Sequence, residues 1–198
     1  MNDWTGNSKS VHVTLGANNH SEKERVDKDF YATDPKAVKY LLEKESFSNS
    51  ILEPCVGGGH IAEVLKDSGY NVMAMDIVDR GYPYTIVQDF LEYNEKFGGD
   101  IITNPPYREA LEMVQHSLEL ISDGHKVAMF LKIQFLEGKK RREFFKEYPP
   151  KYVYVFSGRV NCFRNGDMTN KDSSAVCYCW YIWEKGYKGE PIVRWIDN

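Results

Sequence analysis

After residue 33 the hydrophobic pattern alternates between short apolar runs and longer segments whose apolar residues lie three or four positions apart. Short runs in which most side chains are apolar are typical of strands buried on both faces of a sheet. We predict seven such strands, at 50–55, 71–78, 84–90, 99–104, 126–133, 151–157 and 175–183. The longer segments predict helices that begin near 35, 60, 109 and 139.

Strands and helices that alternate along a chain form mainly parallel sheets with helices on both faces. The pattern therefore predicts an α/β fold built on a mainly parallel, seven-stranded sheet. Residues 1–28 are polar and have no periodicity, which is typical of an arm or an irregular loop. We therefore expect a polar N-terminal arm at 1–28 and a single domain at 29–198.

The composition narrows the class of protein. No apolar run approaches the roughly 18 residues that a membrane span needs, and the N-terminus has no apolar signal-peptide core. The four cysteines form no CxxC pair, and the five histidines are scattered, so we expect reduced thiols and no metal site. These features indicate a cytoplasmic protein that does not associate with membranes.

The net charge of −4 argues against a protein that coats nucleic acid through bulk electrostatics. The segment 138–164 differs, because it carries eight Lys or Arg and only two Glu, a local net charge of +6. Such a segment is either a solvated helix face or one side of a protein that faces phosphates. Its basic residues are Lys139, Lys140, Arg141, Arg142, Lys146, Lys151, Arg159 and Arg164.

In open parallel sheets, ligands bind beyond the carboxyl ends of the strands. The first predicted strand ends in Glu53, shortly before three glycines at 57–59. The glycines fit neither the GxGxxG pattern of dinucleotide sites nor the phosphate loop of nucleotide hydrolases. A carboxylate at this place would repel a pyrophosphate, but it suits a cationic group such as the amine of an amino acid.

The next strand ends carry further polar groups. Asp76 follows the second strand at the distance where nucleotide-binding folds hold a ribose diol, with Asp79 as a second candidate. Asp89 and Phe90 follow the third strand and suit the amine and the face of an adenine. Each alone is consistent with a helix cap or a surface carboxylate. Together they describe a ligand with an amino acid, a ribose and an adenine, which is S-adenosylmethionine.

The fourth strand ends in Asn-Pro-Pro-Tyr, and here the sequence resembles the S-adenosylmethionine-dependent DNA N6-adenine methyltransferases. The family's glycine motif, Asp/Glu-Pro-x-x-Gly-x-Gly, is matched at 53–59, and its catalytic motif is matched letter for letter at 104–107. The resemblance implies a Rossmann-like class I methyltransferase fold. It implies cofactor contacts from Tyr31, Thr33, Glu53, Pro54, Gly57, Gly59, Asp76, Asp89, Phe90 and Asn104.

The resemblance covers about 29–183, and the order of motifs is that of one known permutation class. The chain is most similar to the compact methyltransferases of bacteriophages and prophages, which implies the cytoplasm of a bacterial or phage-infected cell. The family's restriction-type members carry a separate target-recognition domain, and we expect none after Trp183. Sequence-specific recognition of DNA is therefore in doubt.

The Asn-Pro-Pro-Tyr motif has a direct chemical interpretation. An exocyclic adenine amine is a poor nucleophile, and the Asn104 side-chain oxygen and the Pro105 carbonyl can accept its two hydrogens. Two acceptors stabilise the positive charge that develops as the methyl group transfers. Pro105 and Pro106 fix the backbone, and Tyr107 would stack on a base, flipped out if the DNA is duplex.

The predicted substrate contacts extend beyond this motif. Phe163 is a candidate for the second wall of the base pocket, although a loop aromatic packed on the core explains it equally well. Arg159 and Arg164 flank it, and the basic helix supplies candidates for contacts with phosphates at Lys139, Lys140, Arg141 and Arg142.

Other functions are compatible with parts of this pattern. The same four letters serve enzymes that methylate RNA bases, and others that methylate a glutamine side chain in a protein. A binding module without catalysis and a nicotinamide-dependent dehydrogenase are further alternatives. Asn104 and Tyr107 of the catalytic motif are both present, which disfavours a binding module without catalysis. Glu53 lies beside a glycine loop that lacks GxGxxG, which disfavours a dehydrogenase.

Overall fold

We analysed a computed structural model of the 198-residue chain, which describes residues 31–164 and 176–198. The predicted N-terminal arm at 1–28 lies outside the described residues. Among the described helices, none combines the length and the hydrophobicity that crossing a membrane requires.

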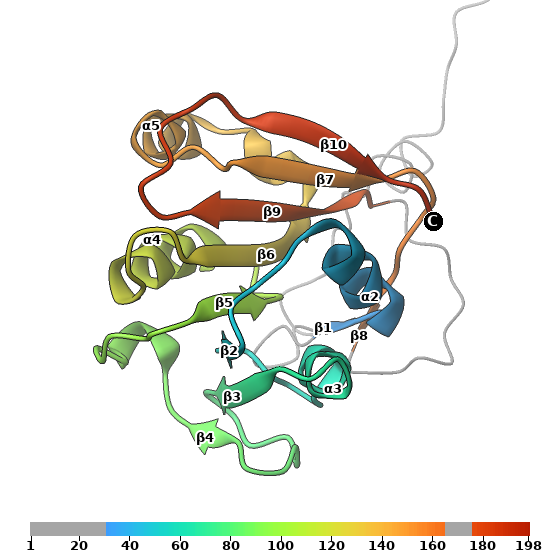
Figure 1. Cartoon of the computed structure of the whole chain (residues 1–198). Coiled ribbons are helices and arrows are strands. Elements are labelled where there is room, and N and C mark those ends of the chain that lie inside the picture. The colour runs from blue at the N-terminus through green and yellow to red at the C-terminus, as the bar shows by residue number, and fades with distance from the viewer. Residues whose placement is uncertain (1–30, 165–175) are drawn as a thin grey trace, which may run out of the picture.

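The core of the molecule is a sheet of eight strands in the order β10-β7-β9-β6-β5-β2-β3-β4 (Figure 1). All neighbouring strands are parallel except β9, which is antiparallel to both β6 and β7. The strand bounds are β2 (Ser50–Glu53), β3 (Asn71–Asp76), β4 (Ile86–Val87), β5 (Asp100–Thr103), β6 (Lys126–Lys132), β7 (Tyr152–Phe156), β9 (Tyr178–Glu184) and β10 (Ile192–Ile196).

The seven predicted strands are all present, and the mainly parallel α/β fold is confirmed. The eighth strand, β10, pairs in parallel with β7 at the edge of the sheet and was not predicted. It leaves Ile192, Val193 and Trp195 exposed, and only Ile196 is buried. A strand that buries so little surface gives a weak hydrophobic signal in the sequence.

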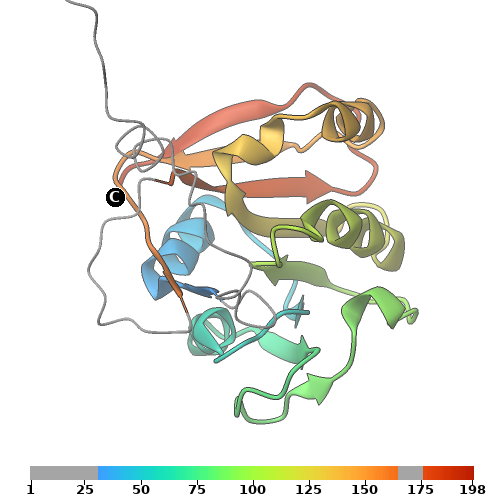
Figure 2. The ribbon, with the colours of Figure 1, turned by 180° about the vertical axis from the view of Figure 1, so that it is seen from behind.

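Helices cover both faces of the sheet (Figures 1 and 2). Side chains of α2 (Pro35–Lys44) and α3 (His60–Asp67) share one apolar core with alternate residues of the strands, among them Ile51, Ile102 and Trp180. Side chains of α4 (Ala110–Leu120) and α5 (Lys139–Glu147) share the opposite core with the other strand residues, among them Leu52, Ile101 and Tyr181. Two short 3-10 helices, η2 (Phe90–Glu92) and η3 (Ile133–Leu136), follow β4 and β6.

A second, two-stranded ribbon joins distant parts of the chain. β1 (Tyr31–Thr33) pairs antiparallel with β8 (Cys162–Arg164), and Ala32 lies opposite Phe163. Immediately after β1, the Asp34 carboxylate accepts a hydrogen bond from the backbone N–H of Lys36 and caps α2, which begins where the sequence predicts a helix, near residue 35. The ribbon therefore has a fixed position relative to the helix that follows it.

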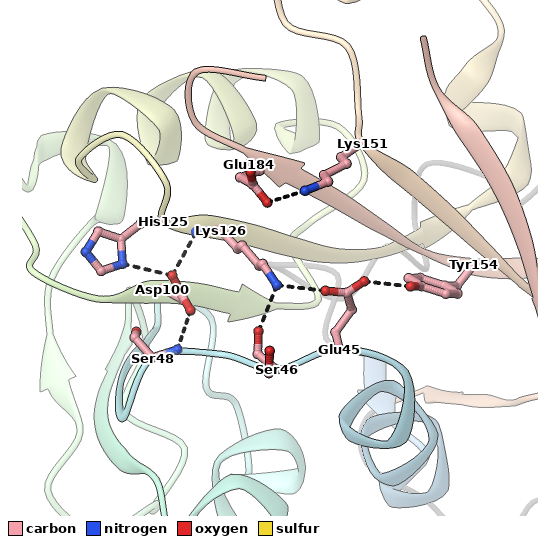
Figure 3. Close-up of polar contacts among 9 residues, drawn as sticks. All are labelled: Glu45, Ser46, Ser48, Asp100, His125, Lys126, Lys151, Tyr154 and Glu184. Carbon is pink, nitrogen blue, oxygen red and sulfur yellow. Dashed lines mark hydrogen bonds and ion pairs between the residues drawn. The ribbon is translucent and has the colours of Figure 1, made fainter. Parts of the chain in front are cut away.

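A polar network joins the amino ends of the central strands (Figure 3). Buried Asp100, the first residue of β5, accepts hydrogen bonds from the backbone N–H groups of Ser48 at 2.6 Å and Lys126 at 2.7 Å. It also contacts His125 Nδ1 at 3.0 Å. The Lys126 ammonium lies 2.8 Å from the Glu45 carboxylate, which in turn accepts a hydrogen bond from the Tyr154 hydroxyl. Each oxygen of the Asp100 and Glu45 carboxylates therefore has a hydrogen-bond donor at the amino ends of the strands.

Replacing Asp100 with Ala should destabilise the fold by about 2–4 kcal/mol, because two part-buried backbone N–H groups lose their acceptor. The free energy of unfolding, measured by urea titration, checks this expectation. Lys146→Ala is the matched control, since its ion pair with Glu143 is solvent-exposed and should contribute less than about 1 kcal/mol. Equal stability of Asp100→Ala and wild type would contradict the structural role of the network.

Candidate functional site

A cavity lies at the carboxyl ends of β2, β3 and β5. The polar network lies at the other end of the same strands. Its empty volume is about 600 Å³, counting the mouth that opens to solvent. Six of the predicted site residues line it: Tyr31, Thr33, Glu53, Asp76, Asn104 and Pro106. The fold therefore brings together residues that are as much as 75 positions apart in the sequence.

The glycine loop connects β2 to α3 beside this cavity. Gly57 and Gly59 have positive φ angles of 52° and 85°, a conformation that other residues rarely adopt. A Cβ atom on Gly59 would lie 2.1 Å from the Tyr82 ring, so a side chain at this position would clash. The backbone requires glycine at 59 for two reasons, whatever ligand the cavity holds. Pro54 is buried and leads into the loop.

Glu53 supplies a buried carboxyl group to the cavity. Its side chain is 1% exposed, and its Oε2 atom has no hydrogen-bond partner among the described residues. Burial holds the pKa of this carboxyl well above its ordinary value, and the negative charge of Asp76 adds to the effect. A ligand with a cationic or hydrogen-bond-donating group would satisfy the unpartnered oxygen.

Asp76, at the end of β3, is also buried and holds the glycine loop in place. One carboxylate oxygen accepts a hydrogen bond from the Gly57 N–H at 2.8 Å, and the other accepts one from the Val78 N–H at 2.9 Å. Each carboxylate oxygen can accept a second hydrogen bond, so Asp76 retains the capacity to bind ligand hydroxyls. Asp79 instead accepts a hydrogen bond from the Gly81 N–H in an exposed turn.

The predicted adenine contacts, Asp89 and Phe90, do not line this cavity. The Asp89 carboxylate caps η2 by accepting a hydrogen bond from the Leu91 N–H. The Phe90 ring is 3% exposed and packs edge-on against His116, so it offers no free face for stacking. Our expectation of a Phe90–adenine stack therefore needs correction, because the chain enters η2 at this point and turns the ring into the core.

Ile77 is one of the apolar residues that line the cavity. Its side chain is 48% exposed and lines the cavity directly after Asp76, together with Arg80. Ile77 therefore gives the cavity an exposed apolar surface. In the sequence it cannot be distinguished from the buried residues of the predicted strand at 71–78.

The Asn104 side chain is oriented by the β1–β8 ribbon. Its Nδ2 atom donates hydrogen bonds to the Tyr31 carbonyl oxygen and to Thr33 Oγ1, both at 3.0 Å. A backbone carbonyl can only accept, so the amide must present nitrogen to Tyr31 and cannot be flipped. The Oδ1 atom is consequently turned away, buried and without a partner among the described residues. Thr33 thus contacts the Asn104 side chain as well as the cavity.

Tyr107 lies beside Asn104 in a cluster of aromatic rings. Its ring centroid is 5.9 Å from that of Tyr31 and 6.3 Å from that of Tyr178, and its hydroxyl donates a hydrogen bond to Cys162 Sγ at 3.8 Å. Burial raises the pKa of Tyr107 above its ordinary range and raises that of the Cys162 thiol to about 12. Both groups are therefore neutral near pH 7, and the thiol is no candidate nucleophile.

The other predicted substrate residues lie outside this cavity. Phe163 is half-buried in β8, where the backbone of Arg164 pairs with Tyr31, and Arg159 is exposed just before that strand. Lys139, Lys140 and Arg142 are exposed on α5. Their contacts with a substrate remain predictions. Within 31–164 and 176–198, no three His, Cys, Asp or Glu side chains are grouped so that they could hold a metal ion.

Arg141 differs from its neighbours on α5 because it is half-buried and anchored. Its Nε donates a hydrogen bond to the Glu137 carbonyl at 2.5 Å, and its Nη2 donates one to the Gln134 carbonyl at 3.4 Å. Its guanidinium carbon lies 5.3 Å from the centroid of the Phe135 ring. Arg141 is therefore held against the end of η3, whereas the neighbouring lysines extend into solvent.

Comparison with known proteins identifies the fold. No protein-family model matches the sequence, and no curated protein sequence matches it. A candidate RNA methyltransferase from Pyrococcus horikoshii has a TM-score of 0.58 at 12% identity, covering 89% of this chain and 98% of that one.

Two further structures share the arrangement. The modification subunit of a candidate type I restriction enzyme from Vibrio vulnificus YJ016 has a TM-score of 0.56 at 11% identity, covering 87% of this chain and 48% of that subunit. Magnesium protoporphyrin IX methyltransferase from Synechocystis PCC 6803, solved with bound S-adenosylmethionine, has a TM-score of 0.53 at 11% identity, covering 77% of this chain and 79% of that one. The chain therefore has the Rossmann-like α/β fold of the class I methyltransferases.

Proposed function

We propose that this protein is an S-adenosylmethionine-dependent methyltransferase that modifies nucleic acid, and that its target is the N6 amine of adenine in DNA. The observation that carries the proposal is the orientation of the Asn104 amide. The Tyr31 carbonyl fixes the amide nitrogen, and this leaves a buried, unpartnered Oδ1 beside a cavity that suits the cofactor. An acceptor held in this way is suited to the hydrogen of an amine substrate.

The residues of the cavity fit S-adenosylmethionine. The unpartnered Glu53 carboxyl suits the cationic amine of the methionine part, and Asp76 suits the ribose hydroxyls. When bound, the cofactor supplies a methyl group on a sulfonium, a good leaving group that needs no metal. Ile77 offers an apolar surface for the adenine in place of Phe90.

The protein's own residues would act on the substrate amine in three ways. Asn104 Oδ1 and the Pro105 carbonyl accept its two hydrogens, which favours a tetrahedral nitrogen whose lone pair is available for attack. The same acceptors stabilise the positive charge on nitrogen until one proton leaves to water. Pro105 and Pro106 restrict the backbone, so the acceptors need no reorganisation.

Two features favour a nucleic acid base as the substrate. The first is Tyr107 directly after the acceptors, since stacking on an aromatic ring contributes about 1–3 kcal/mol per base. The second is the basic helix α5, whose exposed lysines suit phosphates. The fold and the four-residue motif are equally compatible with amines of RNA bases, so RNA is the alternative that the following experiment separates.

Wild-type protein should transfer labelled methyl from S-adenosylmethionine to duplex or single-stranded DNA and yield N6-methyladenine, identified by mass spectrometry of the nucleosides. Asn104→Ala should reduce the rate by about 100- to 1,000-fold, because one acceptor for the developing charge is lost. Its affinity for the cofactor, measured by calorimetry, should stay within a few-fold of wild type. Total RNA and a glutamine-containing protein extract are run in parallel. Methylation confined to either would overturn the DNA proposal.

Thr33→Val should lower kcat by about tenfold, because the Asn104 amide loses one of the acceptors that orient it while the shape of the side chain is kept. Thr33→Ser retains the hydroxyl and should recover most of the activity. The KM for S-adenosylmethionine should change less than kcat in both variants. Equal loss of kcat in the Ser and Val variants would show that the hydroxyl does not position Asn104.

Cofactor binding should strengthen as the pH rises through the raised pKa of Glu53. Burial favours the protonated carboxyl in the free protein and a cationic amine favours the charged form, so binding releases a proton. Calorimetry in buffers of different ionisation enthalpy measures this proton release. Glu53→Gln should bind the cofactor more weakly and lose the pH dependence. A wild-type affinity that does not vary with pH would contradict this role.

A further inference from the structure

A second cavity lies next to the proposed reaction site. It is lined by Tyr107, Leu131, Lys132, Gln134, Phe135 and Arg141, which we call the α5-side groove, and its empty volume is about 400 Å³ including the open part. Tyr107 belongs to this groove and also to the small pocket that contains Tyr31, Asn104 and the two prolines. Anything that stacks on Tyr107 therefore has the groove within reach.

The charge of the groove is positive and is not neutralised by the described residues. Lys132 is half-buried at the end of β6, and its ammonium lies over the Tyr107 ring, 4.5 Å from the centroid. Among residues 31–164 and 176–198, neither Lys132 nor Arg141 forms an ion pair with a carboxylate. A partly buried cation without a counter-charge is unfavourable unless an anion arrives to share the site.

Arg141 presents free donors in the same groove. A guanidinium has five N–H groups, and the bonds to the Glu137 and Gln134 carbonyls use two of them. These bonds and the Phe135 ring hold the group in one place, so little side-chain freedom is lost when the remaining donors bind an anion. Planar donors of this kind match the oxygens of a phosphate.

The floor of the groove is apolar. Leu131 is 1% exposed and Phe135 is 7% exposed, so water has few partners beneath the two cations. Attraction between charges is stronger where water is excluded. An aromatic ring beside a cationic channel is also the arrangement by which proteins hold single strands of nucleic acid, with bases on the ring and phosphates on the cations.

We propose that the α5-side groove binds the phosphodiester next to the target nucleotide, with Lys132 and Arg141 as its ligands. The proposal rests on the proposed function, because it places the base on Tyr107. It assigns to Lys132 a short-range role that the exposed lysines of α5 do not have. A phosphate fixed beside the stacked base would set which nucleotide of the strand reaches Asn104.

The test is the salt dependence of DNA binding. Fluorescence anisotropy with a labelled 20-nucleotide mixed-sequence single strand gives the Kd between 25 and 200 mM NaCl, with S-adenosylmethionine affinity measured separately by calorimetry. Lys132→Gln and Arg141→Gln should each weaken binding by about 5- to 20-fold at 100 mM. Each should also reduce the slope of log K against log salt by about 0.7, because one cationic contact with the phosphate of a single strand is lost. Cofactor affinity should stay unchanged.

Lys188→Gln is the matched control. Its ammonium also lies over a tyrosine ring, 5.3 Å from the Tyr148 centroid. Lys188 follows the end of β9, however, which lies at the amino end of β6, whereas the groove lies at the carboxyl end of β6. This variant should keep the wild-type Kd and slope. If both groove variants keep the wild-type slope, the groove proposal is wrong, and methyl transfer to DNA by the wild type would still support the proposed function. Absence of methyl transfer by wild type would overturn the proposed function, and the binding slopes would still decide the groove.

Discussion

The hydrogen bond between the Asn104 amide and the Tyr31 carbonyl determines what the site can do. Because a carbonyl has no hydrogen to donate, it fixes the amide nitrogen toward the ribbon and leaves the amide oxygen for the proposed substrate. A catalytic acceptor on an asparagine is ambiguous until a neighbour settles its orientation. Here one neighbour is the Tyr31 backbone, whose carbonyl is kept whatever the side chain at 31, and the other is the Thr33 hydroxyl.

The amino and carboxyl ends of the parallel strands differ in how their polar groups are satisfied. At the amino ends, Asp100 and Glu45 are surrounded by donors, and the network ties three strands to the loop before β2. At the carboxyl ends, Glu53 and Asn104 each keep a buried oxygen without a partner among the described residues. Buried polar atoms without partners are unfavourable, and a protein retains them where a ligand completes the bonding. The polar groups at the amino ends therefore stabilise the fold, whereas those at the carboxyl ends are free to bind a ligand.

The sequence was sufficient for the features that depend on local patterns. Apolar runs located seven strands, and the spacing of apolar residues located the start of α2 near residue 35, because these signals come from neighbouring residues. It was insufficient where tertiary contacts decide. Phe90 was expected to face a ligand, yet η2 turns it onto His116, and the exposed strand β10 carried too little hydrophobic signal. Lys132 drew no attention because its significance lies in its distance to Tyr107, which no spacing reveals.

The β1–β8 ribbon has a consequence for folding. Its paired residues Ala32 and Phe163 are about 130 positions apart in the sequence, so closing the ribbon costs loop entropy that contacts between nearby residues do not. The Asn104 amide acquires its orientation only when β1, the strand that carries Tyr31 and Thr33, is in place. The central strands can therefore pair, and Trp180 and Trp183 can be buried, before the Asn104 amide is oriented. Competence for chemistry would then be the last property that a newly synthesised chain acquires.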